Sequence, residues 1–164
     1  MFPDDIDVLA ATVIRLAIAR GLQVATAESC TGGLVAGALT GVAGSSAVVD
    51  RGFVTYSNAA KTDLVAVPAA LIAAHGAVSE PVARAMAAGA VERSAAGVTV
   101  AVTGIAGPGG GTADKPVGLV HFAAAGPAGL VHVEHRFGDL GREAVRLASV
   151  RVALGLLIDR LQAE

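Results

Sequence analysis

Short apolar segments alternate along this chain with longer segments whose hydrophobic residues recur at helical spacing. Residues 4–20 show the helical pattern, with apolar side chains three, seven and ten positions after Ile6. Residues 98–102 are apolar and β-branched, as is typical of a buried strand. The same reasoning predicts strands at 22–27, 48–56, 98–102, 117–125 and 130–137. It predicts helices at 4–20, 31–41, from Asn58 as N-cap, from Ser79 as N-cap to Gly97, and at 141–162.

Five strands interleaved with helices predict an α/β fold, a single three-layer α/β/α domain. The last two expected strands flank the turn Gly126-Pro127-Ala128-Gly129, which is typical of a hairpin. A hairpin makes an antiparallel pair, so the sheet of about five strands should be mixed. No repeat, linker or charge run divides the 164 residues, and we therefore expect residues 1–164 to form one domain.

The composition argues against several classes of protein. A hydrophobic fraction of 54% with 16% charged residues predicts a folded chain. The net charge of −2 is scattered and provides no electrostatic footprint for nucleic acid or an anionic membrane. The mean hydropathy is +0.65, but the charge-free stretches 29–49 and 94–113 contain glycines, and the second contains Pro108, which does not suit a lipid-exposed helix. A lone cysteine and an acidic N-terminus predict a soluble cytoplasmic protein.

Ser29 lies where an expected strand ends and an expected helix begins, within Ala-Glu-Ser-Cys-Thr-Gly-Gly (27–33). Ligands of open α/β sheets collect at such strand ends. We expect Thr31, Gly32 and Gly33 to form the first helical turn, whose amides would stabilise an oxyanion after attack by Ser29. Two other interpretations stay open. Ser29 and Thr31 could be helix caps, and Cys30 could be the nucleophile or a buried apolar residue.

Lys61 is a candidate base for a serine nucleophile. With Asn58 as N-cap, Lys61 takes the third helical position, where the positive end of the helix dipole disfavours an ammonium group. Burial would lower its pKa further, from about 10.4 toward neutrality. Tyr56 could pass a proton or hold a substrate group. An exposed Lys61 paired with Asp63 is the alternative, and the four histidines show no spacing typical of a base or a metal site.

The segment 103–112, Thr-Gly-Ile-Ala-Gly-Pro-Gly-Gly-Gly-Thr, follows an expected strand. Successive amides in such a loop can cradle a phosphate, and Lys115 could add positive charge. The segment matches neither the Walker A nor the Rossmann pattern. Arg142 and Arg146 are four residues apart, so they share a helix face and could bind an anion together. A flexible connection and a solvated helix face are the alternatives.

In combination these segments resemble the CinA C-terminal domain family, in order over about residues 5–160. The resemblance is carried by 27–33, Tyr56-Ser57-Asn58-x-x-Lys61, Val78-Ser79-Glu80, 103–110 and Lys115-Pro116-Val117-Gly118. It implies nicotinamide-nucleotide amidase activity, in which nicotinamide mononucleotide and water give nicotinate mononucleotide and ammonia. It also implies a mixed sheet of about five strands and a homo-oligomer.

The family's serine and lysine fall on Ser29 and Lys61, and its tyrosine on Tyr56. We expect Ser29 to attack the carboxamide while Lys61 takes its proton, with no cofactor or metal. The expected substrate-binding residues come from the two glycine-containing segments and the last helix: Cys30, Thr31, Gly32, Gly33, Thr103, Gly104, Gly107, Gly109, Gly110 and Arg142.

One departure from the family concerns Arg142. The family usually has an arginine directly after Gly-Asp, whereas Gly138-Asp139 is followed here by Leu140-Gly141-Arg142. The register of Arg142, and with it a substrate role, stays open at this stage. Two further alternatives are a non-catalytic module that binds a nucleotide phosphate, and an enzyme that acts on another amide.

Overall fold

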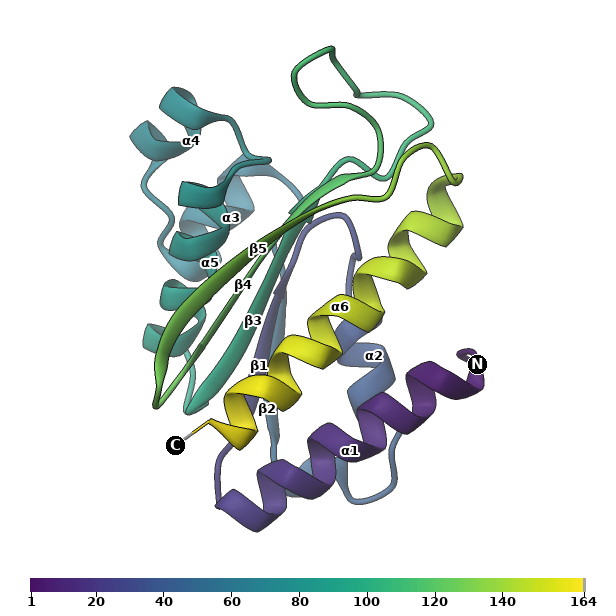
Figure 1. Ribbon diagram of the computed structural model, residues 1–164. Coiled ribbons are helices and arrows are strands. Elements are labelled where there is room, and N and C mark those ends of the chain that lie inside the picture. Colours follow the sequence, from purple (N-terminus) through teal and green to yellow (C-terminus); the bar gives the residue numbers. More distant parts are fainter. Residues whose placement is uncertain (164) are drawn as a thin grey trace.

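The computed structural model describes residues 1–163, which form one five-stranded mixed sheet with helices on both faces (Figure 1). The spatial order of the strands is β2-β1-β3-β4-β5. Their bounds are β1 Val24–Glu28, β2 Val49–Val54, β3 Val98–Gly104, β4 Leu119–Gly126 and β5 Gly129–Arg136. Strand β1 is parallel to β2 and β3, and the hairpin strands β4 and β5 run antiparallel. The predicted mixed α/β sheet is confirmed.

The helices form two layers, one on each face of the sheet (Figure 1). One layer contains α1 (Asp4–Arg20), α2 (Leu34–Thr40) and α6 (Arg142–Gln162), and the other contains α3 (Asn58–Val65), α4 (Ala69–His75) and α5 (Glu80–Glu92). Each layer packs on its own apolar core, because neighbouring strand residues alternate between the faces. Phe122 of β4 belongs to the α6 core, whereas Ala123 belongs to the α5 core. The three-layer prediction is therefore confirmed.

The prediction that Thr31, Gly32 and Gly33 form the first turn of α2 was wrong. The helix begins at Leu34, and Gly32 and Gly33 instead form a turn with φ of +57° and +97°. The carboxylate of Glu28 accepts the amides of Val35 and Ala36 at 2.8 and 2.9 Å, so it occupies the N-terminus of the helix. Buried amides need such a partner, and the left-handed turn lets the chain fold back over Glu28.

Two other helix ends differ from the prediction. Ser57, rather than Asn58, caps α3, and its Oγ accepts the Ala60 amide at 3.0 Å. Both residue types cap helices well, and the extended backbone of Ser57 decides between them. Helix α5 ends at Glu92, so Gly97 lies in the connection to β3. The short alanine-rich α4 was not predicted, because its sequence has too few periodic positions.

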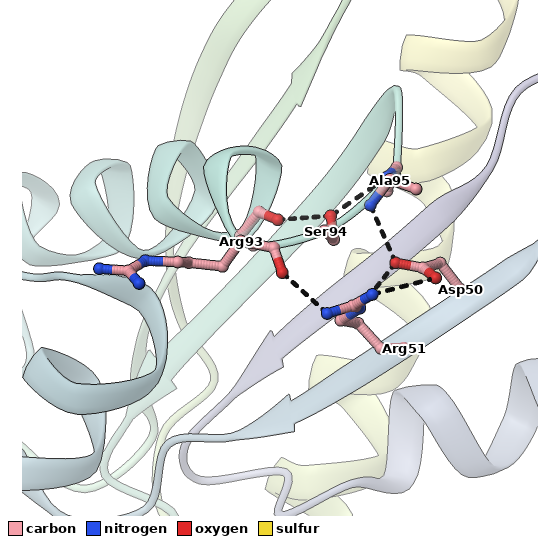
Figure 2. A network of polar contacts seen from close by, with 7 residues as sticks. Asp50, Arg51, Arg93, Ser94 and Ala95 are labelled. Atoms are coloured by element: carbon pink, nitrogen blue, oxygen red, sulfur yellow. Dashed lines mark hydrogen bonds and ion pairs between the residues drawn. The ribbon is translucent and has the colours of Figure 1, made fainter.

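A polar network fastens the edge of the sheet where β2 begins (Figure 2). Asp50 accepts hydrogen bonds from Arg51 Nε at 2.7 Å and from the Ala95 amide at 3.0 Å, and Arg51 also donates to the Arg93 carbonyl at 3.0 Å. This network joins β2 to the end of α5. The parallel strands β1, β2 and β3 are in register, so Glu28, Val54 and Val102 lie side by side at the opposite end of the sheet, where Ser29 follows β1.

Gly89 lets α3 approach α5 closely. A Cβ atom at this position would overlap the carbonyl oxygen of Val65, the last residue of α3. Backbone atoms cannot move aside as a side-chain end can, so only glycine permits this spacing. The contact sets the position of the helix that carries Lys61.

Gly89→Ala is expected to lower the free energy of unfolding by about 1–3 kcal/mol, because the added methyl group forces the two helices apart. Chemical denaturation measures the change. Gly155→Ala is the matched control, since a Cβ there would meet nothing within 4 Å and alanine favours the interior of α6. Equal stability of the two variants would show that the close approach of α3 and α5 carries no constraint.

Candidate active site

Ser29 and Lys61 meet at the carboxyl edge of the sheet. The Lys61 Nζ lies 3.0 Å from the Ser29 Oγ and also donates to the Thr55 carbonyl at 2.9 Å. Lys61 is only 1% exposed, and burial lowers the pKa of its amine from the ordinary value. The side chains of Ser29 and Lys61 are thus in contact, as the proposed pair requires. The alternative of an exposed Lys61 paired with Asp63 is wrong, because Lys61 is buried. A neutral amine in this place can accept the serine proton.

A cavity of about 240 Å³ opens beside this pair. Its walls come from the end of β1, the start of α3, the α4–α5 connection, the end of β3 and the start of α6. The lining residues are Ser29, Cys30, Tyr56, Asn58, Lys61, Ala77, Val78, Thr103, Gly104, Ala106 and Arg142. No acidic side chain lines the cavity and Arg142 supplies a positive charge, so the cavity suits an anionic ligand.

Arg142 connects the start of α6 to the glycine-rich segment and to Tyr56. Its Nη1 donates to the Gly107 carbonyl at 2.9 Å, and its Nη2 donates to the Tyr56 hydroxyl at 3.0 Å. Tyr56 is 59% exposed and therefore stands at the mouth rather than beside Lys61. Arg142 thus lines the cavity although it stands two residues later than the family's arginine after Gly-Asp.

Cys30 also lines the cavity, but its thiol is only 6% exposed. Burial raises the pKa of the thiol to about 12, so very little thiolate exists near neutral pH. The neighbouring Ser29 has a base in contact with its hydroxyl, whereas Cys30 has no such hydrogen bond within residues 1–163. The geometry favours Ser29 over Cys30 as the nucleophile.

Thr31, Gly32 and Gly33 do not line the cavity. Thr31 is fully buried, and its hydroxyl has no hydrogen-bond partner within residues 1–163. Arg146 secures this turn, because its Nε donates to the Cys30 carbonyl at 3.1 Å and its Nη2 donates to the Thr31 carbonyl at 3.0 Å. Arg146 thus holds the main chain that follows the nucleophile.

Most of the glycine-rich segment between β3 and β4 projects away from the cavity. Thr103, Gly104 and Ala106 line it, while Gly109 and Gly110 are exposed and lie outside the lining. Gly107 takes part only through its carbonyl bond to Arg142. The other lysine, Lys115, donates to the His75 carbonyl at 2.6 Å and so ties the segment to the end of α4. A phosphate bound here would meet Arg142 rather than Lys115.

The histidines lie outside the cavity lining. His121 and His132 share a hydrogen bond of 3.0 Å on the α5 face, and desolvation lowers the pKa of both rings. His135 packs against Phe122 on the other face, as the spacing of His132 and His135 predicted. No group of three or more potential metal ligands occurs in residues 1–163. No helix in that range is long and apolar enough to cross a membrane.

Four lining residues were not among the predicted site residues. Asn58 was predicted only as a helix cap, and Ala77, Val78 and Ala106 carry no reactive group. Thr55, whose carbonyl accepts the Lys61 amine, was also missed. Asn58, Val78 and Ala106 lie within the segments that carry the family resemblance, which was their sequence signal. Ala77 and the Thr55 carbonyl had none, because main-chain and alanine contacts depend on the folded path.

The fold and this geometry define a three-layer α/β protein with a buried serine–lysine pair at the carboxyl edge of its sheet. Residues 6–161 match the CinA C-terminal domain, and the chain belongs to this family. A CinA-like protein of Anaeromyxobacter dehalogenans (strain 2CP-C) is 54% identical over 158 residues, which cover 96% of this chain and 38% of that relative. The chain thus spans well under half the length of that curated relative. The resemblance inferred from the motifs is confirmed.

Solved structures agree with this assignment. The competence/damage inducible protein CihA from Agrobacterium tumefaciens is 58% identical, with a TM-score of 0.97 and coverage of 99% of both chains. A competence-damaged protein (CinA) superfamily protein from Escherichia coli is 37% identical, with a TM-score of 0.89 and coverage of 96% of this chain and 92% of that one.

The native thiol of Cys30 should resist alkylation. At pH 8, iodoacetamide is expected to leave the folded protein unmodified over a time in which urea-unfolded protein reacts completely, because the buried thiol stays protonated. Intact-protein mass spectrometry reads the result directly, since Cys30 is the only cysteine. Rapid modification of the folded protein would restore Cys30 as a candidate nucleophile.

Proposed function

We propose that this chain is an amidohydrolase that converts nicotinamide mononucleotide and water to nicotinate mononucleotide and ammonia. The observation that carries the proposal is the 3.0 Å contact between the buried Lys61 amine and the Ser29 hydroxyl. A serine with an adjacent general base is the arrangement that acyl transfer requires. The Arg142 guanidinium in a lining without acidic side chains supports a substrate that bears a phosphate.

In the first half of the reaction, the Ser29 Oγ attacks the carboxamide carbon and its proton passes to the Lys61 Nζ. The tetrahedral intermediate then collapses. The C–N bond breaks, and the departing nitrogen takes the proton from Lys61 and leaves as ammonia. An ester between Ser29 and the nicotinoyl group remains. The Thr55 carbonyl keeps the Lys61 amine in place throughout.

In the second half, water attacks this ester while Lys61 accepts a proton from the water. The ester bond breaks, Ser29 regains its proton, and nicotinate mononucleotide is released. The pyridine carboxylate and the phosphate both carry negative charge. Arg142 at the cavity mouth is the residue placed to bind the phosphate of substrate and product.

Two main-chain amides support the oxyanion in this proposal. The Ile105 amide donates to the Leu119 carbonyl at 2.9 Å, so the alternation of the ladder turns the preceding amide, that of Gly104, toward β1. The amides of Gly104 and Cys30 have no main-chain acceptor within residues 1–163, and both residues line the cavity. They replace the Thr31–Gly33 amides expected from the sequence. Such donors stabilise developing negative charge.

Substitution of either member of the pair tests the mechanism. Ser29→Ala and Lys61→Ala should each lower ammonia release from nicotinamide mononucleotide by at least about 10³-fold, because nucleophile and base act as a unit. Ammonia is measured by a coupled assay, and Cys30→Ser serves as the control that keeps activity. Binding without turnover by the unaltered chain would indicate a non-catalytic nucleotide-binding module. Full activity of Ser29→Ala would contradict the nucleophile assignment.

The pH profile tests Lys61 separately. The amine works as a base only when neutral, so kcat/KM should fall as the pH drops below the pKa of Lys61. Burial lowers this pKa, so the inflection should lie below the ordinary lysine value of about 10.4. Lys115→Gln, which alters the other lysine, should leave the inflection unchanged. A kcat/KM that does not fall at any pH below about 10.4 would rule out Lys61 as the base.

A further inference from the structure

Asn58 is the only asparagine in the chain, and it lines the cavity that contains Ser29 and Lys61. The sequence suggests that its side chain caps α3, but Ser57 performs that task. The side chain of Asn58 makes no hydrogen bond within residues 1–163. Its amide is therefore available to a ligand.

Asn58 lies at the rim of the cavity. Asn58 and Lys61 are three residues apart on α3, so they share a helix face. Lys61 is buried against Ser29, whereas Asn58 is exposed. Asn58 also borders the adjoining hollow between α3 and α4, which Thr62 and Ile72 help to line. Asn58 therefore lines the same cavity as Ser29, with its side chain closer to solvent.

The chemistry of the side chain narrows what it can recognise. Asn58 is uncharged and offers two N–H donors and one carbonyl acceptor, which match adjacent hydroxyl groups. A phosphate at the same mouth is better matched by the guanidinium of Arg142, and the carboxamide is placed deeper, at Ser29.

We propose that Asn58 is a specificity residue that hydrogen-bonds the sugar hydroxyls of the substrate, between the carboxamide at Ser29 and the phosphate at Arg142. This inference rests on the proposed function, because that function supplies the sugar. It makes the site selective for a ribosyl substrate over a free pyridine carboxamide.

The test pairs a change in the protein with a change in the substrate. Ammonia release is measured for the unaltered chain, Asn58→Ala and Thr62→Ala, with nicotinamide mononucleotide and its 2′-deoxy and 3′-deoxy analogues. Asn58→Ala should raise KM for the parent nucleotide about three- to tenfold with kcat nearly unchanged, as expected for one lost hydrogen bond. Thr62→Ala is the control on the same helix, outside the cavity lining, and should change neither constant.

If Asn58 contacts a sugar hydroxyl directly, the losses caused by Asn58→Ala and by removal of that hydroxyl are not additive, whereas a structural effect of Asn58→Ala would add to the loss from the analogue. At least one deoxy analogue should lose about as much as the Asn58 substitution, and the two losses should not add. Asn58→Ala should also melt at the same temperature or higher, since the Ser57 cap remains and alanine favours helix. Additive losses with both analogues, or an unchanged KM in Asn58→Ala, would overturn the proposal.

A binding experiment distinguishes this inference from the proposed reaction. Calorimetry of nicotinamide mononucleotide and the same analogues with Ser29→Ala, with and without Asn58→Ala, needs no turnover. The same three- to tenfold, non-additive loss of affinity would support the role of Asn58 even if the unaltered chain released no ammonia. Absence of binding to Ser29→Ala would overturn the role of Asn58.

Discussion

The amine of Lys61 is buried at the place where α3 meets the ends of β1 and β2, and the surrounding structure is organised around it. A buried amine needs hydrogen-bond partners, which Ser29 and the Thr55 carbonyl supply. Its helix must also sit close to the sheet. The Ser57 cap fixes where α3 begins, and Gly89 lets its last turn approach α5. The same desolvation that makes Lys61 costly to bury lowers its pKa and makes it a base.

The serine is held by a second set of contacts from the other helical layer. The Glu28 carboxylate binds the first amides of α2, and Arg146 of α6 binds the carbonyls of Cys30 and Thr31. The turn that carries Ser29 is therefore held both before Ser29, at Glu28, and after it, at Cys30 and Thr31. A helix N-terminus occupied by Glu28 is not open to an oxyanion. Under the proposed mechanism, that role passes to amides at the ends of β1 and β3.

The sequence predicted the fold class well, and it singled out Ser29 and Lys61, whose side chains are in contact in the structure. The hairpin turn at 126–129 predicted a mixed sheet, and the strand–helix junction singled out Ser29. Predictions that depended on a local choice among similar residues did worse. The sequence predicted Asn58 as the α3 cap, whereas Ser57 is the cap in the structure. Both residue types suit the position, and only the backbone conformation separates them. The glycine-rich segment and an arginine were the two candidates for holding a phosphate, and Arg142 lines the cavity whereas Gly109 and Gly110 do not.

The sequence by itself determined the five strands and the longer helices, and it set the order of the motifs, because hydrophobic periodicity and glycine placement are local properties. Tertiary structure decided which of those motifs share a cavity. Arg142 reaches the mouth despite its shifted position, Lys115 binds His75 elsewhere, and Asn58 is freed from capping. Such outcomes depend on contacts between residues far apart in the chain. They arise only when helices and strands pack and bring the hydrogen-bonding groups of distant segments together.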